Sequence, residues 1–322
     1  MRTNSALVGC MDGFPPRPES TVTVDVMMPF YGRPDHFRAA VESVLTQNDP
    51  HWRLVIIDDV YPDTAPGEWA RAIEDDRVTY IRNETNLRPS RNYNKAIGLT
   101  ESEFVVIMGC DDIMLPGYIG RVRELIAEFP DATVIQPGVS VIDENGAPSR
   151  PLPDRVKALY RFRGPFPRAF GGEQLAVSLL RGNWTYFPSL VWRASHVKKK
   201  GFRTDLDVVQ DLAMLFDITS SGGTLVLDDR EVFNYRRHST SVSAVTGPDG
   251  SKFRQERTLF REAQATCRSL GWNRATRVAR NYFLSRLNAL TELPGALVHG
   301  NVAGRSNLTR HVLGLPYRSN PG

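Results

Sequence analysis

Two adjacent carboxylates, Asp111 and Asp112, follow an apolar run at residues 104–108 and the single Gly109. Such a run is typical of a strand buried on both faces of a sheet, so the aspartates stand at the carboxyl end of that strand. Open α/β sheets bind their ligands at this edge. Neighbouring carboxylates repel each other unless a cation or water takes up the charge, and a divalent ion that bridges to phosphates suits them. Without further context, the pair also fits a solvated turn.

Another carboxylate, Asp211, stands in the first turn of an amphipathic helix expected at 208–219. A side chain at this place can project past the helix end and accept the proton of an attacking hydroxyl. Asp211 could instead cap the helix, and Asp205 and Asp207 are close enough in the sequence to act in its place.

Residues at the ends of two earlier strands suit a nucleotide base. Pro29, Phe30 and Tyr31 end the first strand, and a base binds well beside an apolar or aromatic face. Asp58 closes the second strand, followed by Asp59, and a carboxylate there can accept a hydrogen bond from a base N–H or a ribose hydroxyl. Aromatic packing of the turn and helix capping are the structural alternatives.

Cationic side chains at two further places suit phosphate. Arg88, Arg91 and Asn92 open a helix, and helix N-termini and guanidinium groups both attract phosphate. Arg236 and Arg237 stand at the end of the last expected strand and could neutralise a diphosphate. A solvated helix end is the alternative for the first group.

Single aromatic and imidazole side chains complete the candidate site. His238 could be a third metal ligand or contact a diphosphate, although a lone histidine is usually neither. Trp184, Tyr186 and Trp192 could stack against an acceptor sugar, and packing in the core is an equal alternative for each.

The order of the expected elements indicates an α/β fold with a mostly parallel central sheet flanked by helices. Strand and helix alternate four times from Thr21 onward, which is typical of a doubly wound sheet. The second half is less regular. Its strands are expected at 133–136, 139–142, 190–192, 224–227 and 231–236, and its helices at 118–129, 172–180 and 208–219.

Three segments outside this alternation have their own character. Residues 145–168 are rich in Pro and Arg, and we expect a long mobile loop that could gate the substrate. Two helices are expected at 253–270 and 272–290, followed by an irregular tail from Gly295. The expected organisation is a flexible arm at 1–20, an α/β domain at 21–245 and a helical extension at 246–322.

The two C-terminal helices combine arginines with aromatic and apolar residues. Peripheral basic helices of this kind could reach a lipid-linked acceptor, and a helical cap with a solvated basic face is the plainer alternative. The residues concerned are Arg254, Arg257, Arg261, Arg274, Arg277, Arg280 and Arg286, beside Phe260, Tyr282, Phe283 and Leu287.

The composition is ordinary for a soluble globular protein, with 322 residues of which 41% are hydrophobic and 24% charged. The net charge of +4 is compatible with anionic nucleotides or a membrane surface and specifies neither. Cys10, Cys110 and Cys267 show no zinc spacing and no disulfide framework, which favours a reducing compartment. No apolar run is long enough to span a bilayer, and no signal-peptide pattern begins the chain. We expect a cytoplasmic protein, at most peripheral to the inner face of a membrane, with no nucleic-acid partner.

The turn at Asp111 and Asp112 resembles the metal-binding turn of glycosyltransferase family 2, whose members have the GT-A fold. That turn usually reads Asp-x-Asp-Asp, and Gly109 stands where the first Asp would be. The resemblance covers roughly residues 21–245. Three more segments resemble family motifs in the same order: residues 86–92 an Asn-x-Gly…Arg-Asn stretch, Gln210-Asp211 a Glu-Asp pair, and residues 235–243 a Tyr-Arg-x-His…Ser-x-Ser ending.

The resemblance implies an inverting enzyme that moves a sugar from a nucleoside-diphosphate sugar, above all a UDP-sugar, to a hydroxyl of a glycan or glycolipid. A divalent ion, Mn²⁺ or Mg²⁺, would neutralise the leaving diphosphate through Asp112, with Asp111 on the ribose or the same ion. It also implies that residues 29–31 and Asp58 hold the base, and that Asp211 is the general base.

Two other functions share parts of this pattern. A nucleotidyltransferase would use a similar sheet and metal, but it should carry a Gly-rich loop after the first strand, where this chain reads Pro-Phe-Tyr-Gly-Arg-Pro. A non-catalytic sugar- or partner-binding domain is favoured by Gly109 and Gln210, which depart from the family pattern. Donor hydrolysis with and without metal separates an enzyme from a binding domain.

Overall fold

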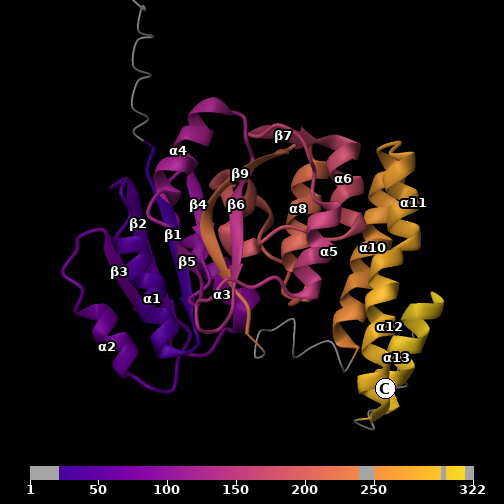
Figure 1. Cartoon of the computed structure of the whole chain (residues 1–322), viewed down its shortest axis with the longest axis horizontal. Helices are drawn as coiled ribbons and strands as arrows, with labels where there is room; N and C mark the ends of the chain where they lie inside the picture. Colours follow the sequence, from indigo (N-terminus) through magenta and orange to yellow (C-terminus); the bar gives the residue numbers. More distant parts are fainter. Residues whose placement is uncertain (1–21, 239–249, 299–301, 316–322) are drawn as a thin grey trace, which may run out of the picture.

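The computed structural model describes residues 22–238, 250–298 and 302–315. Figure 1 shows an α/β domain with helices on both faces of a central sheet, and a block of C-terminal helices at its side. The arm expected at 1–20 and the domain boundary expected after residue 245 lie outside the described residues.

The first half of the chain alternates strand and helix, as the sequence predicts. Its elements are β1 (Val24–Phe30), α1 (Pro34–Leu45), β2 (Trp52–Asp58), α2 (Ala65–Arg71), β3 (Val78–Arg82), α3 (Arg88–Gly98) and β4 (Phe104–Ile107). The four strands lie in the order β3-β2-β1-β4 and all pair in parallel. Their carboxyl ends therefore open at one edge of the sheet, where ligands of such sheets bind.

The second half continues the sheet in mixed directions. Its elements up to the last strand, apart from a helix described below, are β5 (Ile113–Met114), α4 (Tyr118–Glu128), β6 (Val134–Ile142), β7 (Arg168–Gly171), α6 (Gly172–Arg181), β8 (Val191–Arg193), α7 (Ala194–Lys200), α8 (Gln210–Ser220) and β9 (Thr224–Arg236). Strand β8 is antiparallel to both β4 and β6, whereas β6 and β9 are parallel. The four short strands expected at 133–142 and 224–236 are two long ones, because the chain crosses a register shift in β6 without leaving the sheet.

Two apolar layers hold the helices on the sheet. Side chains alternate along β1, so that Val26 and Met28 face one layer and Met27 faces the other. Helices α1, α2 and α4 cover the first layer, and α3, α6, α7 and α8 cover the second. The strand ends that carry the candidate site therefore rest on a rigid core.

The predicted mobile loop at 145–168 is wrong in its central part, because residues Leu152–Tyr160 form helix α5. Its apolar residues Leu152, Val156 and Leu159 are exposed, while Asp154 is buried. A helix is normally recognised in a sequence from an apolar face that packs on the core. Helix α5 instead turns its polar face inward, so the usual pattern did not reveal it.

The C-terminal block contains α10 (Ser251–Ser269), α11 (Asn273–Asn281), α12 (Phe283–Val298) and α13 (Val302–Leu313), drawn in yellow tones in Figure 1. Side chains of α10 and α11 pack on α6 and α8, which joins the block to the sheet. The single helix expected at 272–290 is divided at Tyr282, whose φ of 30° ends α11. The irregular tail expected from Gly295 is also wrong, since α13 lies there. None of the described helices is long and apolar enough to cross a membrane.

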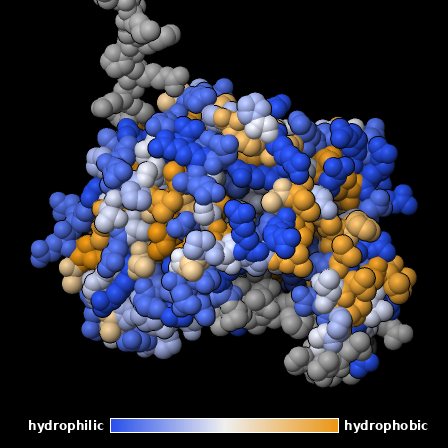
Figure 2. Space-filling view, viewed as in Figure 1, coloured by the Kyte–Doolittle hydropathy of each residue, from blue (hydrophilic) through white to orange (hydrophobic). Residues whose placement is uncertain are grey.

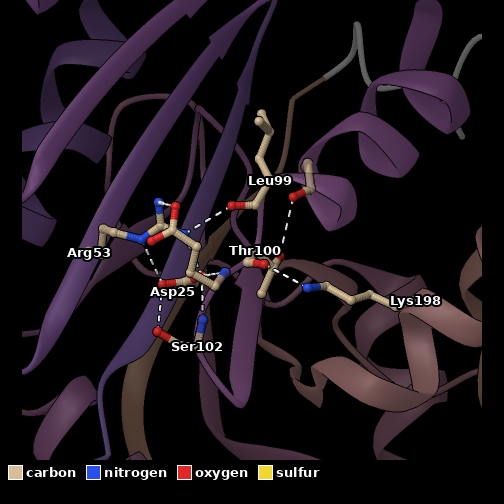
Figure 3. A network of polar contacts seen from close by, with 8 residues as sticks. Asp25, Arg53, Leu99, Thr100, Ser102 and Lys198 are labelled. Carbon is tan, nitrogen blue, oxygen red and sulfur yellow. Dashed lines mark hydrogen bonds and ion pairs between the residues drawn. The ribbon is translucent and has the colours of Figure 1, made fainter.

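A buried carboxylate, Asp25, fixes the amino end of β1 (Figure 3). Arg53 of β2 donates to it from Nε at 3.0 Å and Nη2 at 2.7 Å. Ser102 donates from its backbone N–H and its hydroxyl, and Glu101 donates from its backbone N–H. Burial by itself raises the pKa of Asp25, but these hydrogen bonds outweigh it and the net shift is downward. Asp25 thus joins β1, β2 and the segment that enters β4.

Candidate active site

The Asp111–Asp112 turn follows β4, as predicted, and β9 holds it from the other side. Asp112 is 1% exposed, and its Oδ1 accepts the backbone N–H of Arg236 at 2.8 Å. The Arg236 guanidinium donates to the backbone carbonyl of Asp111 at 2.6 Å and to those of Asp143 and Glu144 at 3.2 Å. Arg236, which the sequence suggests for phosphate, is therefore buried and positions the turn.

Asp111 faces the third residue suggested for metal. His238 Nε2 lies 2.6 Å from Asp111 Oδ2, and both side chains are partly exposed. Asp111 and His238 are thus in contact, although no group of three His, Cys, Asp or Glu side chains within the described residues is arranged to hold a metal ion. The role of His238 as a ligand stays a prediction.

The turn fits a divalent cation on two observations. Asp112 Oδ2 is buried and has no hydrogen-bond partner among the described residues, and burial together with the charge of Asp111 raises the pKa of Asp112 well above its ordinary value. A buried carboxylate oxygen in this state is costly unless a cation or a proton compensates it. Gly109 provides the space, because a Cβ there would overlap the Asp112 carboxylate and lie 2.8 Å from Asp111 Oδ1. The departure from the family pattern at Gly109 is therefore compatible with a metal site.

The residues suggested to contact the nucleotide base differ in how exposed their side chains are. Phe30 is fully buried and stacks on Phe37 with ring centroids 3.9 Å apart, so it belongs to the core. Tyr31 is 56% exposed and meets the ring of Tyr61 edge-on at 5.7 Å. Pro29 lies beside them in β1 and is partly exposed. Of the three predicted residues, Tyr31 offers the largest aromatic surface to a ligand.

Asp58 is buried and makes bonds within the fold. Its Oδ1 accepts the Tyr61 N–H at 2.8 Å, and its Oδ2 accepts the Tyr80 hydroxyl and Arg82 Nη1, both at 2.6 Å. Asp58 therefore links β2 to β3 and to the loop after β2. Its predicted contact with a nucleotide base remains a prediction.

The start of α3 is held by Asp59, which accepts the backbone N–H groups of Leu87 and Arg88 at 2.7 and 3.0 Å. The side chains of Arg88 and Arg91 are exposed at this helix end, where an anion would meet both the guanidinium groups and the helix dipole. Asn92 is buried, and its Oδ1 accepts Asn83 Nδ2 at 3.1 Å. Of the three predicted residues, the two arginines are accessible to a phosphate.

Asp211 lies in the first turn of α8, as predicted, and Asn183 Nδ2 donates to its Oδ2 at 2.7 Å. Burial raises the pKa of Asp211, which makes the carboxylate a stronger base. The two neighbouring carboxylates are used elsewhere. Asp207 accepts the Ser90 hydroxyl at 2.7 Å, and Asp205 pairs with Arg203 on the surface.

Helix α5 brings further polar residues that sequence reasoning missed. Asp154 accepts two hydrogen bonds from Arg237, at 3.0 and 2.8 Å, and one from the Tyr186 hydroxyl at 3.0 Å. Lys157 Nζ lies 4.4 Å from the centre of the Tyr186 ring, and burial and the charge of Arg237 lower its pKa to about 8. The charges of Asp154 and Asp211 oppose this shift, so Lys157 lies within the electrostatic reach of the predicted base.

Tyr93 of α3 is a second missed residue. Burial, followed by the charges of Cys110, Asp111 and Asp211, raises its pKa above the ordinary range. Tyr93 is therefore within electrostatic reach of both Asp111 in the metal turn and Asp211, the predicted base. No local motif marks Tyr93, because its position follows from how α3 packs on the sheet.

Two tryptophans suggested for an acceptor sugar are in the core instead. Trp184 is 1% exposed, and its Nε1 donates to Ser178 Oγ at 3.0 Å. Trp192 of β8 is fully buried. These rings leave no surface for a sugar, and the packing alternative applies to both. Tyr186 remains beside Tyr235, with ring centroids 5.2 Å apart.

The architecture is that of GT-A glycosyltransferases. The fold is similar to that of S. aureus TarS 1-349 in complex with UDP-GlcNAc, with a TM-score of 0.58 and 14% identity over 92% of this chain and 93% of that one. It is also similar to the mannosyltransferase PcManGT from Pyrobaculum calidifontis in complex with GDP-Man and Mn²⁺, with a TM-score of 0.60 and 14% identity over 93% of this chain and 82% of that one. At this level of identity the similarity concerns the fold.

Part of the sequence matches a family model. Residues 25–178 match the model of Glycosyl transferase family 2. The chain is 24% identical over 191 residues to the "Uncharacterized glycosyltransferase MJ1057" of Methanocaldococcus jannaschii, which is 58% of this chain and 61%, less than two thirds, of that relative. Residues 25–178 are therefore similar to glycosyltransferase family 2, and the expected resemblance to that family and the expected GT-A fold are confirmed.

Proposed function

We propose that this enzyme transfers a sugar, with inversion, from a nucleoside-diphosphate sugar to a hydroxyl of a glycan or glycolipid, and that it depends on a divalent cation. The observation that carries the proposal is the buried Asp112 Oδ2, which has no partner among the described residues and lies beside Asp111 at the carboxyl edge of the sheet. A hard cation prefers such oxygens and completes its coordination with phosphate oxygens and water. Asp112 and Asp111 would hold the ion, which when bound would neutralise the leaving diphosphate.

A UDP-sugar is the donor we expect. TarS was solved with UDP-GlcNAc and PcManGT with GDP-Man and Mn²⁺, which supports a nucleoside-diphosphate sugar and a divalent ion without selecting the base. In this chain the exposed Tyr31 ring would lie against the base, and Arg88 and Arg91 at the start of α3 would attract the diphosphate. A thermal-shift screen of UDP- and GDP-sugars with Mn²⁺ tests the choice, because a ligand that binds the folded state raises its apparent stability.

Asp211 would be the general base of the transfer. The acceptor hydroxyl oxygen attacks the anomeric carbon from the face opposite the diphosphate, a new C–O bond forms, and the bond to the diphosphate breaks with its electron pair leaving on the phosphate oxygen. The hydroxyl proton passes to Asp211, whose orientation is fixed by the Asn183 amide. Burial favours this role because the raised pKa increases the affinity of the carboxylate for the proton.

Calorimetric titration of UDP, with Mn²⁺ or with EDTA, tests the role of the turn. We expect wild type to bind UDP at least ~10-fold more tightly with Mn²⁺, and Asp112→Asn to lose this difference. Asp76→Asn makes the same chemical change on an exposed turn and should behave as wild type. Equal affinity of wild type with and without metal would contradict the metal dependence. Transfer or donor hydrolysis that survives in EDTA would contradict it independently.

A further inference from the structure

We propose that one face of the molecule docks onto an anionic phospholipid bilayer. This face, called here the α5–α12 face, consists of the exposed apolar residues of α5 and α12 and the arginine-lined groove between them. Figure 2 shows hydrophobic surface gathered over α5 and over the α12 region, with hydrophilic surface between and around them. The proposal concerns binding to a membrane and is independent of the transfer reaction.

The outer side of α5 is an apolar stripe that no other part of the described chain covers. Leu152, Val156 and Leu159 are 69%, 38% and 65% exposed, and their spacing of four and then three residues places them on one side of the helix. The opposite side carries Asp154 and Lys157, which contact the candidate site. A helix of a soluble protein normally turns its apolar side inward, so the reversed order in α5 indicates an apolar environment outside.

Helix α12 repeats this arrangement. Phe283, Leu287 and Leu290 are 70%, 46% and 49% exposed, again with a spacing of four and then three residues. Single exposed apolar residues are common on protein surfaces and need no explanation. Two stripes with helical spacing on neighbouring elements are a different case, because together they form an extended apolar surface.

A groove of about 450 Å³ lies between α6 and the start of α12. Its walls are apolar, with Val177, Leu180 and Leu284, and its charged residues are Arg181, Arg274 and Arg277. A smaller cavity of about 240 Å³ that includes Leu159 connects this region with the α5 stripe. The whole face is therefore continuous from α5 through the groove to α12.

The positive charge of the groove indicates an anionic partner. Arg181, Arg274 and Arg277 are exposed, none of them forms an ion pair with the described residues, and neither cavity is lined by an acidic side chain. Glu173, on the same helix as Arg181, accepts the backbone N–H groups of Arg274 and Ala275. Apolar stripes beside unpaired arginines match the acyl boundary and the anionic headgroups of a bilayer surface.

Flotation of the full chain with phosphatidylcholine vesicles, with or without phosphatidylglycerol, tests the proposal. We expect wild type to float with the anionic vesicles and to remain mostly unbound with neutral ones. Arg274→Gln/Arg277→Gln should weaken binding roughly 30-fold, since each basic residue near an anionic surface contributes roughly 5-fold. Lys199→Gln/Lys200→Gln on α7 removes the same charge from exposed positions outside the groove and should bind clearly better than the arginine variant.

The apolar contribution is tested by Leu152→Ser/Leu159→Ser, which should weaken binding roughly 10-fold or more because the stripe no longer inserts. Leu152→Met/Leu159→Met keeps the apolar surface and should retain binding. All four positions of these two designs, Arg274, Arg277, Leu152 and Leu159, are exposed, so the variants should melt as wild type does.

Three results would overturn the proposal: wild type that does not float with anionic vesicles, equal binding to neutral and anionic vesicles, and binding that the arginine and serine variants leave unchanged. Dimers in light scattering that Leu152→Ser/Leu159→Ser dissociates, without vesicle binding by wild type, would assign the face to a second copy of the chain. Asp112→Asn should still float, so failure of the proposed metal-dependent transfer and failure of membrane docking are distinguishable.

Discussion

Two carboxylates at opposite ends of the sheet are equally buried and yet have opposite properties. Asp25 at the amino end of β1 is 0% exposed and accepts hydrogen bonds from Arg53, Ser102 and Glu101. Asp112 after β4 is 1% exposed and accepts one, from the backbone of Arg236. The pKa of Asp25 is lowered, whereas that of Asp112 is raised. Burial alone therefore does not separate a structural carboxylate from a functional one; the donors that surround it do.

Asp58 and Asp211 extend this comparison to two further buried or partly buried carboxylates. Asp58 has three donors from neighbouring elements and resembles Asp25 in this respect. Asp211 has one side-chain donor, Asn183, and a raised pKa. The fully bonded carboxylates should matter most for stability and the incompletely bonded ones for binding and turnover.

Asp211→Asn should have the largest effect on function. The amide cannot accept the acceptor's proton, and a positioned general base contributes about 10²–10⁴ in rate, so kcat should fall by about that factor. The change is nearly isosteric, so stability and the dissociation constant of the donor should stay close to wild type. Steady-state transfer kinetics measure the loss. Asp217→Asn on the same helix is the matched control and should keep its kcat. Normal turnover in Asp211→Asn would place the base elsewhere, with Asp207 the next residue to test.

Asp25→Asn should have the largest effect on stability. Removing the charge leaves Arg53 without its buried partner and turns an amide toward a cluster of donors, which costs about 3–5 kcal/mol. Urea unfolding at neutral pH measures this loss. The folded fraction should bind UDP with Mn²⁺ as wild type does.

Asp112→Asn should keep or raise the stability in EDTA, because it removes a buried charge that lacks compensation. If Asp112→Asn lost more unfolding free energy than Asp25→Asn, the interpretation of Asp25 as structural and Asp112 as functional would be wrong.

Gly109→Ala should act on the metal site alone. The added Cβ would overlap the Asp112 carboxylate, so both aspartates must move, and metal-dependent UDP binding should weaken about 10- to 100-fold. Gly117→Ala lies shortly after the turn with no atom within 4 Å of the added Cβ, and it should bind UDP normally. Comparing Mn²⁺ titrations of the two variants measures the effect. Unchanged affinity in Gly109→Ala would show that the carboxylates do not need their present positions.

The smallest predicted effect is on the acid side of the stability profile. The folded-state pKa of Asp25 is below its ordinary value of 3.8, so the stability it contributes is present above that pH and is lost as the pH falls through the folded-state pKa. The difference in unfolding free energy between wild type and Asp25→Asn should therefore be constant near neutrality and shrink below about pH 4. Urea unfolding at several pH values measures it. A difference that grows toward acid pH would contradict the assignment.

The order of the elements in the sequence determined the fold class and the edge of the sheet at which the candidate carboxylates lie. Apolar runs such as residues 104–108 are long enough for buried strands, and alternation with helices leads to a parallel arrangement. Because strand ends in such a sheet share one edge, the positions of Asp58 and Asp111–Asp112 at that edge followed from the sequence. The helix expected at 208–219 and found as α8 at Gln210–Ser220 followed from its helical periodicity, and Asp211 lies in its first turn as predicted.

Only the tertiary structure decided which polar groups are bonded and which are available. Arg236 looks like a phosphate ligand in sequence, yet its guanidinium is bound to backbone carbonyls that come from residues far away in the chain. Trp184 is in the core for the same reason, since burial depends on what packs against a side chain. Helix α5 escaped prediction because its polar face meets the site and its apolar face meets the outside. Periodicity identifies a helical face, but what that face contacts depends on the three-dimensional packing of distant segments.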